Sequence, residues 1–172
     1  MPEMTKPREL FLHELGDILY AERVVLKMLP KLQDEAGDAE LAKGFKRHER
    51  ETEQQVKNLE RVFKSLEEPV KAEQCPGIEG LKAEHDEFVE EEKPSDDILD
   101  AFLTGAASRT EHYEIAAYTG LVASARAMGE KQAVQLLERN LKQEKDMLRD
   151  VEKIARRLAR EGAKKEREAA KS

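Results

Sequence analysis

Two glutamates three residues apart, Glu111 and Glu114, are the residues of this sequence best placed to do chemistry. They lie in the stretch R-T-E-H-Y-E-I-A-A-Y, and residues three apart in a helix share one face. That face is expected to be buried, because it continues through Leu103, Ala107, Tyr118, Leu121 and Val122. Buried carboxylates are costly unless a cation meets them. Two alternatives follow: a polar core paired with Arg or Lys, or a metal site.

The composition favours a bundle of long helices. Charged residues make up 39% of the 172 residues and aromatic residues only 5%, while Leu, Ala, Glu, Lys and Arg dominate. The single Cys75 cannot form an internal disulfide, and no apolar run suits a signal peptide or a membrane span. The net charge of −7 argues against a general nucleic-acid binder. We therefore expect an all-α, cytoplasmic protein with neither a membrane nor a nucleic-acid partner.

Four segments with apolar residues at helical spacing predict helices over residues 7–33, 39–66, 95–129 and 130–160. Short links make the first and second helices, and the third and fourth, antiparallel neighbours. The segment between the two pairs is long enough to return the chain along the bundle, and a short extra helix is expected in it at residues 77–89. The prediction is a four-helix bundle of residues 1–160 with a long crossover. The charged segment 161–172 has no apolar face and is expected to be a frayed tail.

Each helical pair brings acidic residues to one height in the bundle. Glu22 lies 15 residues before the glycine of the first link, and Glu51 lies 14 residues after it. Glu114 and Glu144 each lie 15 residues from Gly129, at the second link. The two pairs therefore repeat the same geometry, and their acids are expected to meet in the core.

The predicted core cluster combines five glutamates with one histidine: Glu22, His48, Glu51, Glu111, Glu114 and Glu144. Five crowded carboxylates cannot all ionise, because mutual repulsion would hold several of them protonated. A pair of divalent cations bridged by the carboxylates resolves this conflict. Carboxylate and imidazole ligands suit iron or manganese, and such sites are known in the cores of helical bundles. The alternative is a set of acids that align without holding a metal.

Four stretches of the chain resemble the bacterial YciE/YciF family of ferritin-like proteins: T-E-H-Y-E-I-A-A-Y, D-I-L-Y-A-E, H-E-R-E-T-E-Q-Q and C-P-G-I-E-G-L. The resemblance implies a ferritin-like fold with a di-metal site similar to that of rubrerythrin. It implies that Glu22 is a first-helix ligand and that Glu51 and Glu144 bridge the metals. The Glu-x-x-His motif of such sites would put histidines at two positions where this chain has Gln54 and Met147.

Two functional hypotheses follow. The first is a ferritin-like di-iron carboxylate protein, with manganese as the other candidate metal, that reacts with peroxide or oxygen in a stress response. Its activity would be of the oxidase or peroxidase type, and the sequence assigns no catalytic residue. The second hypothesis is a metal-poor helical bundle that acts as an interaction or stress protein without catalysis. An isologous homodimer is the expected assembly.

Overall fold

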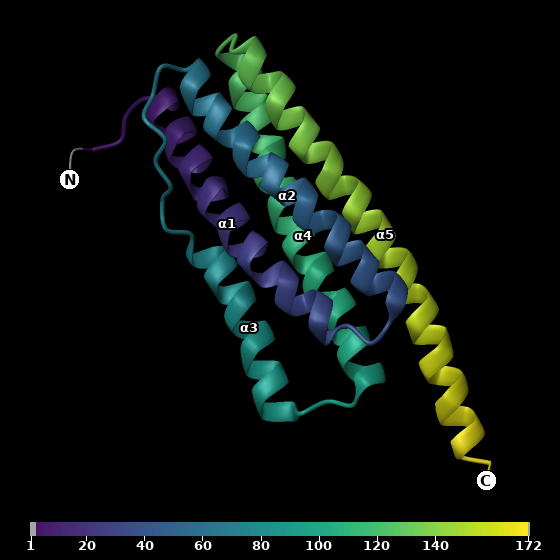
Figure 1. Ribbon diagram of the computed structural model, residues 1–172. Coiled ribbons are helices and arrows are strands. Elements are labelled where there is room, and N and C mark those ends of the chain that lie inside the picture. The colour runs from purple at the N-terminus through teal and green to yellow at the C-terminus, as the bar shows by residue number, and fades with distance from the viewer. Residues whose placement is uncertain (1–2, 172) are drawn as a thin grey trace.

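Five helices make up the computed structural model, which describes residues 3–171: α1 (Pro7–Glu35), α2 (Ala39–Ser65), α3 (Pro76–Glu92), α4 (Asp96–Ala127) and α5 (Lys131–Ala169) (Figure 1). α1 packs on α2, α2 on α5, α5 on α4 and α4 on α1, which closes a four-helix bundle. α3 lies outside it, against α1 and α4. Residues 3–171 contain no strand and no helix with the length and apolar character needed to cross a membrane. The predicted all-α ferritin-like bundle with a helix in its long crossover is confirmed.

The buried residues of each bundle helix follow a heptad spacing. On α2 they form two lines, each with steps of seven residues: Leu41, His48, Gln55 and Val62, and Phe45, Thr52 and Leu59. On α5 the corresponding lines are Ala133, Asn140, Met147 and Ile154, and Leu137, Glu144 and Val151. This spacing keeps one seam of a helix against its neighbours over the whole length of the bundle. The polar members lie near the middle of the lines, between apolar residues on both sides.

The two short links have the geometry typical of helix ends. The carboxylate of Asp38 accepts hydrogen bonds from the backbone N–H groups of Glu40 at 3.1 Å and Leu41 at 2.9 Å, and so caps α2. Arg157 of α5 donates to the same carboxylate at 2.8 Å. Gly129, just after α4, has a φ of 78°, a left-handed conformation that favours glycine. Both links thereby fix the height of each helix relative to its partner.

The last helix is longer than the sequence predicts. The expected end lies near residue 160, but α5 continues to Ala169 and extends beyond the end of the bundle (Figure 1). None of residues 161–171 is buried. Charges one helical turn apart support the extension, as in the ion pair between Lys164 and Glu168 at 3.8 Å. Fraying of this exposed segment in solution stays a prediction.

Replacing Asp38 with Ala is expected to lower the free energy of unfolding by about 1–2 kcal/mol, because two backbone donors at the start of α2 lose their acceptor. Urea denaturation followed by circular dichroism measures the change. Asp34→Ala is the matched control, since Asp34 is exposed in the last turn of α1, and its effect should stay within about 0.5 kcal/mol. Equal losses in both variants would show that the cap contributes nothing.

Candidate metal centre

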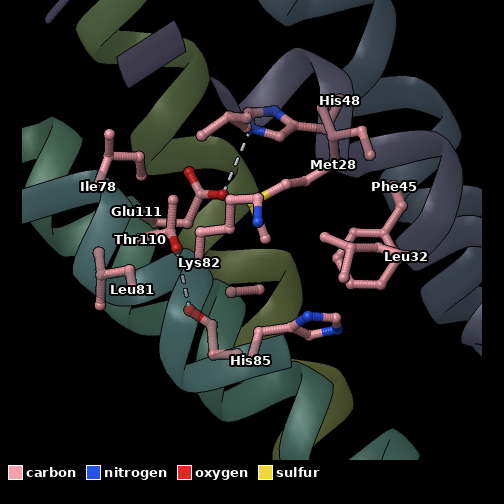
Figure 2. A pocket seen from close by; sticks show the side chains of 14 residues that line it. Met28, Leu32, Phe45, His48, Ile78, Leu81, Lys82, His85, Thr110 and Glu111 are labelled. Carbon is pink, nitrogen blue, oxygen red and sulfur yellow. Dashed lines mark hydrogen bonds and ion pairs between the residues drawn. The ribbon is translucent and has the colours of Figure 1, made fainter. Parts of the chain in front are cut away.

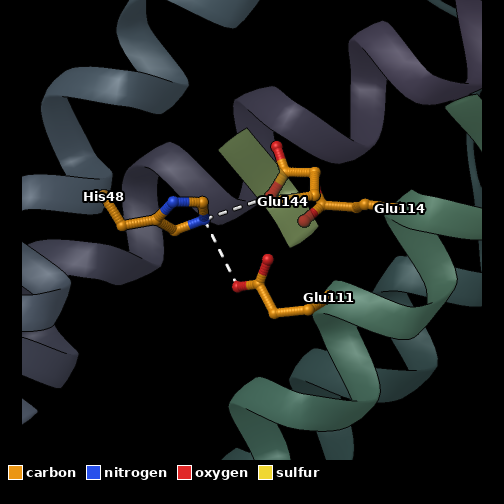
Figure 3. A group of neighbouring side chains, drawn as sticks. All are labelled: His48, Glu111, Glu114 and Glu144. Atoms are coloured by element: carbon orange, nitrogen blue, oxygen red, sulfur yellow. Dashed lines mark ion pairs between the residues drawn. The ribbon is translucent and has the colours of Figure 1, made fainter. Parts of the chain in front are cut away.

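Four buried side chains converge in the middle of the bundle: His48 from α2, Glu111 and Glu114 from α4, and Glu144 from α5 (Figure 3). One ligand atom of each lies within 4.8 Å of the others. The Nε2 atom of His48 is 3.4 Å from Oε1 of Glu111 and 3.6 Å from Oε2 of Glu144. Both distances are longer than a normal hydrogen bond. The side chains therefore approach a common point without bonding directly through the imidazole.

Glu22 of α1 lies beside this group. It is buried, and its charge adds to the effect of burial in raising the pKa values of Glu111, Glu114 and Glu144. The hydroxyl of Tyr118 donates a hydrogen bond to its Oε1 atom, whereas its Oε2 atom has no hydrogen-bond partner. All four bundle helices thus contribute at least one ionisable side chain to the cluster.

Glu51 lies at the side of the cluster, whereas the resemblance to the YciE/YciF family implies that it bridges two metals. Its side chain is 27% exposed and pairs with Arg47 at 3.7 Å, while its other oxygen lies 3.6 Å from Nδ1 of His48. Counting residues from a link gives the height of a side chain but not its direction around the helix. The heptad lines of α2 turn Thr52 and Gln55 inward and leave Glu51 at the side. α2 therefore contributes an imidazole, a hydroxyl and two amides to the core, and no carboxylate.

Neutral hydrogen-bond donors hold one oxygen of two of the glutamates. The amide of Gln55 donates to Oε1 of Glu144, as the hydroxyl of Tyr118 does to Glu22. Asn140 Nδ2 in turn donates to the Tyr118 hydroxyl at 3.0 Å. Groups that bond to metal-ligating side chains commonly fix their orientation in this way. Asn140 was not among the predicted site residues, although its heptad line with Ala133 and Met147 places it in the core.

The charge of the cluster is not balanced by basic residues. Among residues 3–171 no arginine or lysine is buried, so the alternative of a core paired with Arg or Lys is not supported. Burial and the neighbouring carboxylates raise the pKa values of Glu111, Glu114 and Glu144 well above the ordinary range. Burial also raises the pKa of Glu22 to about 7, although the Tyr118 hydrogen bond opposes the shift. Near neutral pH the metal-free cluster therefore holds protons that a cation can displace.

The imidazole of His48 provides the main positive charge available inside the cluster. Burial opposes its protonation, but the carboxylates of Glu51, Glu144 and Glu22 outweigh burial and raise its pKa. A single imidazolium can neutralise no more than one of the carboxylates around it. The remaining acids must stay protonated or meet a cation from outside the chain.

Buried polar atoms without hydrogen-bond partners are concentrated in this cluster. They include one oxygen each of Glu22, Glu111 and Glu144, both oxygens of Glu114 and both ring nitrogens of His48. Buried polar groups in folded proteins nearly always have a partner. Carboxylate and imidazole groups are ligands of iron and manganese. The residues present therefore fit a bound transition-metal ion.

The bundle, its crossover and the buried acids define a ferritin-like protein. The chain matches a family described as a domain of unknown function, DUF892, over residues 6–164, and it belongs to that family. It is 33% identical over 138 residues to protein YciF of Escherichia coli (strain K12), a match that covers 80% of this chain and 82% of YciF.

Two solved structures extend this comparison. The crystal structure of the E. coli stress protein YciF matches with a TM-score of 0.86 and 30% identity, and covers 91% of this chain and 99% of YciF. YcfI from Rhodopseudomonas palustris matches with a TM-score of 0.84 and 37% identity, and covers 87% of this chain and 95% of YcfI. The resemblance to the YciE/YciF family seen in the sequence is confirmed.

The free energy of unfolding of the metal-free protein is expected to fall as the pH rises above about 4.5. The cluster acids have raised pKa values in the folded chain, so the native state binds more protons than the unfolded state. For Glu22 the loss runs from pH 4.5 to about 7 and amounts to about 3 kcal/mol. The raised pKa of His48 acts in the same direction above 6.5. Urea denaturation of chelator-treated protein at several pH values measures the slope.

Glu114→Gln removes one buried charge from the cluster and is expected to flatten this pH dependence. Glu53→Gln is the matched control, because Glu53 lies on the exposed face of α2, away from the cluster, and it should keep the wild-type slope. A metal-free stability that rises with pH above about 5 would contradict the raised pKa values.

Proposed function

We propose that the protein binds a pair of divalent transition-metal ions at Glu22, His48, Glu111, Glu114 and Glu144. The observation that carries the proposal is the concentration of unpaired buried ligand atoms on these five residues. Charge balance supports it, because the four carboxylates, when ionised, match the charge of two divalent cations. Water or bound protons could also satisfy some of these atoms. Protonation at neutral pH, however, requires carboxyl groups that are ionised in water to take up protons on folding.

The contacts of each glutamate suggest its role. Glu22 and Glu144 each have one oxygen held by a neutral donor and one without a partner, so each offers a single oxygen to a metal. Glu114 has two unpaired oxygens and is therefore suited to bridge both ions, the role that the family resemblance implied for Glu51. His48 supplies a nitrogen ligand in place of the histidines of the Glu-x-x-His motif.

Iron is the metal we favour, with manganese as the other candidate, because both suit carboxylate and imidazole ligands. A pair of bound iron ions would supply redox chemistry toward oxygen or peroxide, and the chain would supply the ligands and the apolar surroundings. The E. coli relative is named a stress protein, and we propose a role in a stress response here too. A cytoplasmic homodimer stays a prediction.

The second candidate function is that of a metal-poor bundle that acts as an interaction or stress protein. Three observations favour it. α2 places Gln55 rather than a glutamate in the core. Gln54 and Met147 stand at the two positions where the Glu-x-x-His motif of di-metal bundle sites would put histidines. YcfI, one of the solved relatives, is described provisionally as a structural protein. Metal content separates the two candidates.

Protein produced with supplemented iron or manganese is expected to retain about two ions per chain, measured by mass spectrometry of the metals. Chelation should lower its melting temperature, because the metal binds the folded chain. Glu114→Gln should reduce the metal content by at least about half if Glu114 bridges both ions.

Glu51→Gln is the control for this experiment and should keep the wild-type metal content, because Glu51 lies at the side of α2. A loss as large as that of Glu114→Gln would return the bridging role to Glu51. Wild-type protein that retains no metal after supplementation would favour the metal-poor bundle.

A further inference from the structure

An apolar pocket lies beneath the crossover helix α3 and reaches the candidate metal centre (Figure 2). Its volume is about 40 Å³, and His48 and Glu111 form part of its wall. Most of the other residues that line it are apolar and come from α1, α2, α3 and α4, among them Val25, Leu29, Phe45, Ile78, Leu81 and Ala107. At about 10–15 Å³ for each water-sized molecule, the pocket has room for about three. The pocket therefore gives small molecules a place directly beside two proposed ligands.

The outer side of this pocket adjoins a surface groove between α1 and α3. Met28 and Lys82 line both the pocket and the groove, so they mark the boundary between the two. The groove has four basic and two acidic side chains: Arg23, Lys27, Lys31, Lys82, Glu79 and Asp86. Both acids of the groove are already engaged: Asp86 pairs with Lys31 at 2.8 Å and with Lys82 at 2.6 Å, and Glu79 accepts a hydrogen bond from the Tyr20 hydroxyl. The groove therefore presents no free carboxylate to a metal cation.

The interior of the pocket selects against charged molecules as well. Five polar residues line it, namely His48, Lys82, His85, Thr110 and Glu111, but the other nine are apolar. Apolar side chains cannot replace the hydration shell of an ion, and burying an ion with few polar partners is costly. A small uncharged molecule bears no such penalty, and apolar cavities in proteins accept xenon. Neither a metal cation nor an anion fits both the groove and the pocket, whereas a dioxygen-sized neutral molecule does.

We propose that this pocket is the access and holding site for dioxygen on its way to the metal centre. The inference rests on the proposed function and names its oxidant. A pair of bound Fe²⁺ ions would each supply one electron and become Fe³⁺, and two protons from water would complete the reduction of dioxygen to hydrogen peroxide. Metal ions reach the centre by another route.

Xenon is a suitable probe, because it is apolar, of similar size and visible in crystals of metal-free protein under xenon pressure. Wild-type crystals are expected to show xenon between α3 and His48. Ala107→Leu fills the pocket from α4 and should abolish that site. Ala117→Leu is the matched control on the same helix, because Ala117 is also half-buried but lines a different groove; it should retain the xenon. Ala106→Leu serves as a second blocking variant should Ala107→Leu fail to fold.

The reaction is then followed in protein loaded anaerobically with Fe²⁺ and mixed with dissolved oxygen. Oxidation, monitored by the absorbance of ferric iron, should be at least about tenfold slower in Ala107→Leu than in wild type or Ala117→Leu, because the enlarged side chain fills close-packed space. The rate and amount of metal uptake should be the same in all three proteins. Equal oxidation rates, or an uptake of metal slowed as much as oxidation, would overturn the inference.

The two proposals fail in different ways. Wild-type protein that binds metal but shows no xenon in the pocket would overturn this inference and leave the metal centre intact. Protein that binds xenon but no metal would overturn the proposed function, and this inference with it.

Discussion

One electrostatic constraint underlies the structure: four carboxylates share a buried space with a single imidazole. Burial and mutual repulsion oppose the ionisation of these acids. The apolar parts of the heptad lines offset this cost, because they bury large side chains on both sides of the cluster. Glu22, for example, lies midway between the buried Leu15 and Leu29 on one line of α1. The bundle therefore holds the acids in place without neutralising them, and neutralisation is left to protons or cations.

The neutral donors distinguish this cluster from a structural network of ion pairs. Such a network would place Arg or Lys against the buried acids, but the nearby arginine of α2, Arg47, pairs at the surface with Asp150 at 2.9 Å. Gln55, Tyr118 and Asn140 instead form hydrogen bonds that orient an oxygen or support another donor without cancelling a charge. Neutral donors of this kind orient the carboxylates but add no positive charge, so the carboxylates remain available to bind cations.

The sequence predicted the positions of the acids along the bundle axis well, but it predicted less well which way each side chain points around its helix. Equal counts of residues on either side of each link set the heights, because the links are short and the helices regular. On α2, however, the direction follows the heptad phase of Phe45 and Leu59, which turns Thr52 inward and Glu51 aside. The heptad line of α5 indicates that Asn140 is buried, but its hydrogen bonds with Asn58 and Tyr118 depend on packing between helices far apart in the sequence, and so does the pocket beneath α3. No local pattern contains these contacts.

The crossover makes the two sides of the centre chemically different. On the side of α2 and α5, amides fill the space: Asn58 Nδ2 donates to Asn140 Oδ1 at 2.8 Å, and Asn140 also donates to the backbone carbonyl of Gln55 at 3.2 Å. On the side of α1 and α4, α3 presents Ile78 and Leu81 to the pocket. The chain must return along the bundle in any case, but an irregular segment would bring unpaired backbone groups to this wall. A helix satisfies those groups internally and leaves an apolar surface. The folding of part of the crossover into a helix therefore determines which molecules can approach the buried acids from this side.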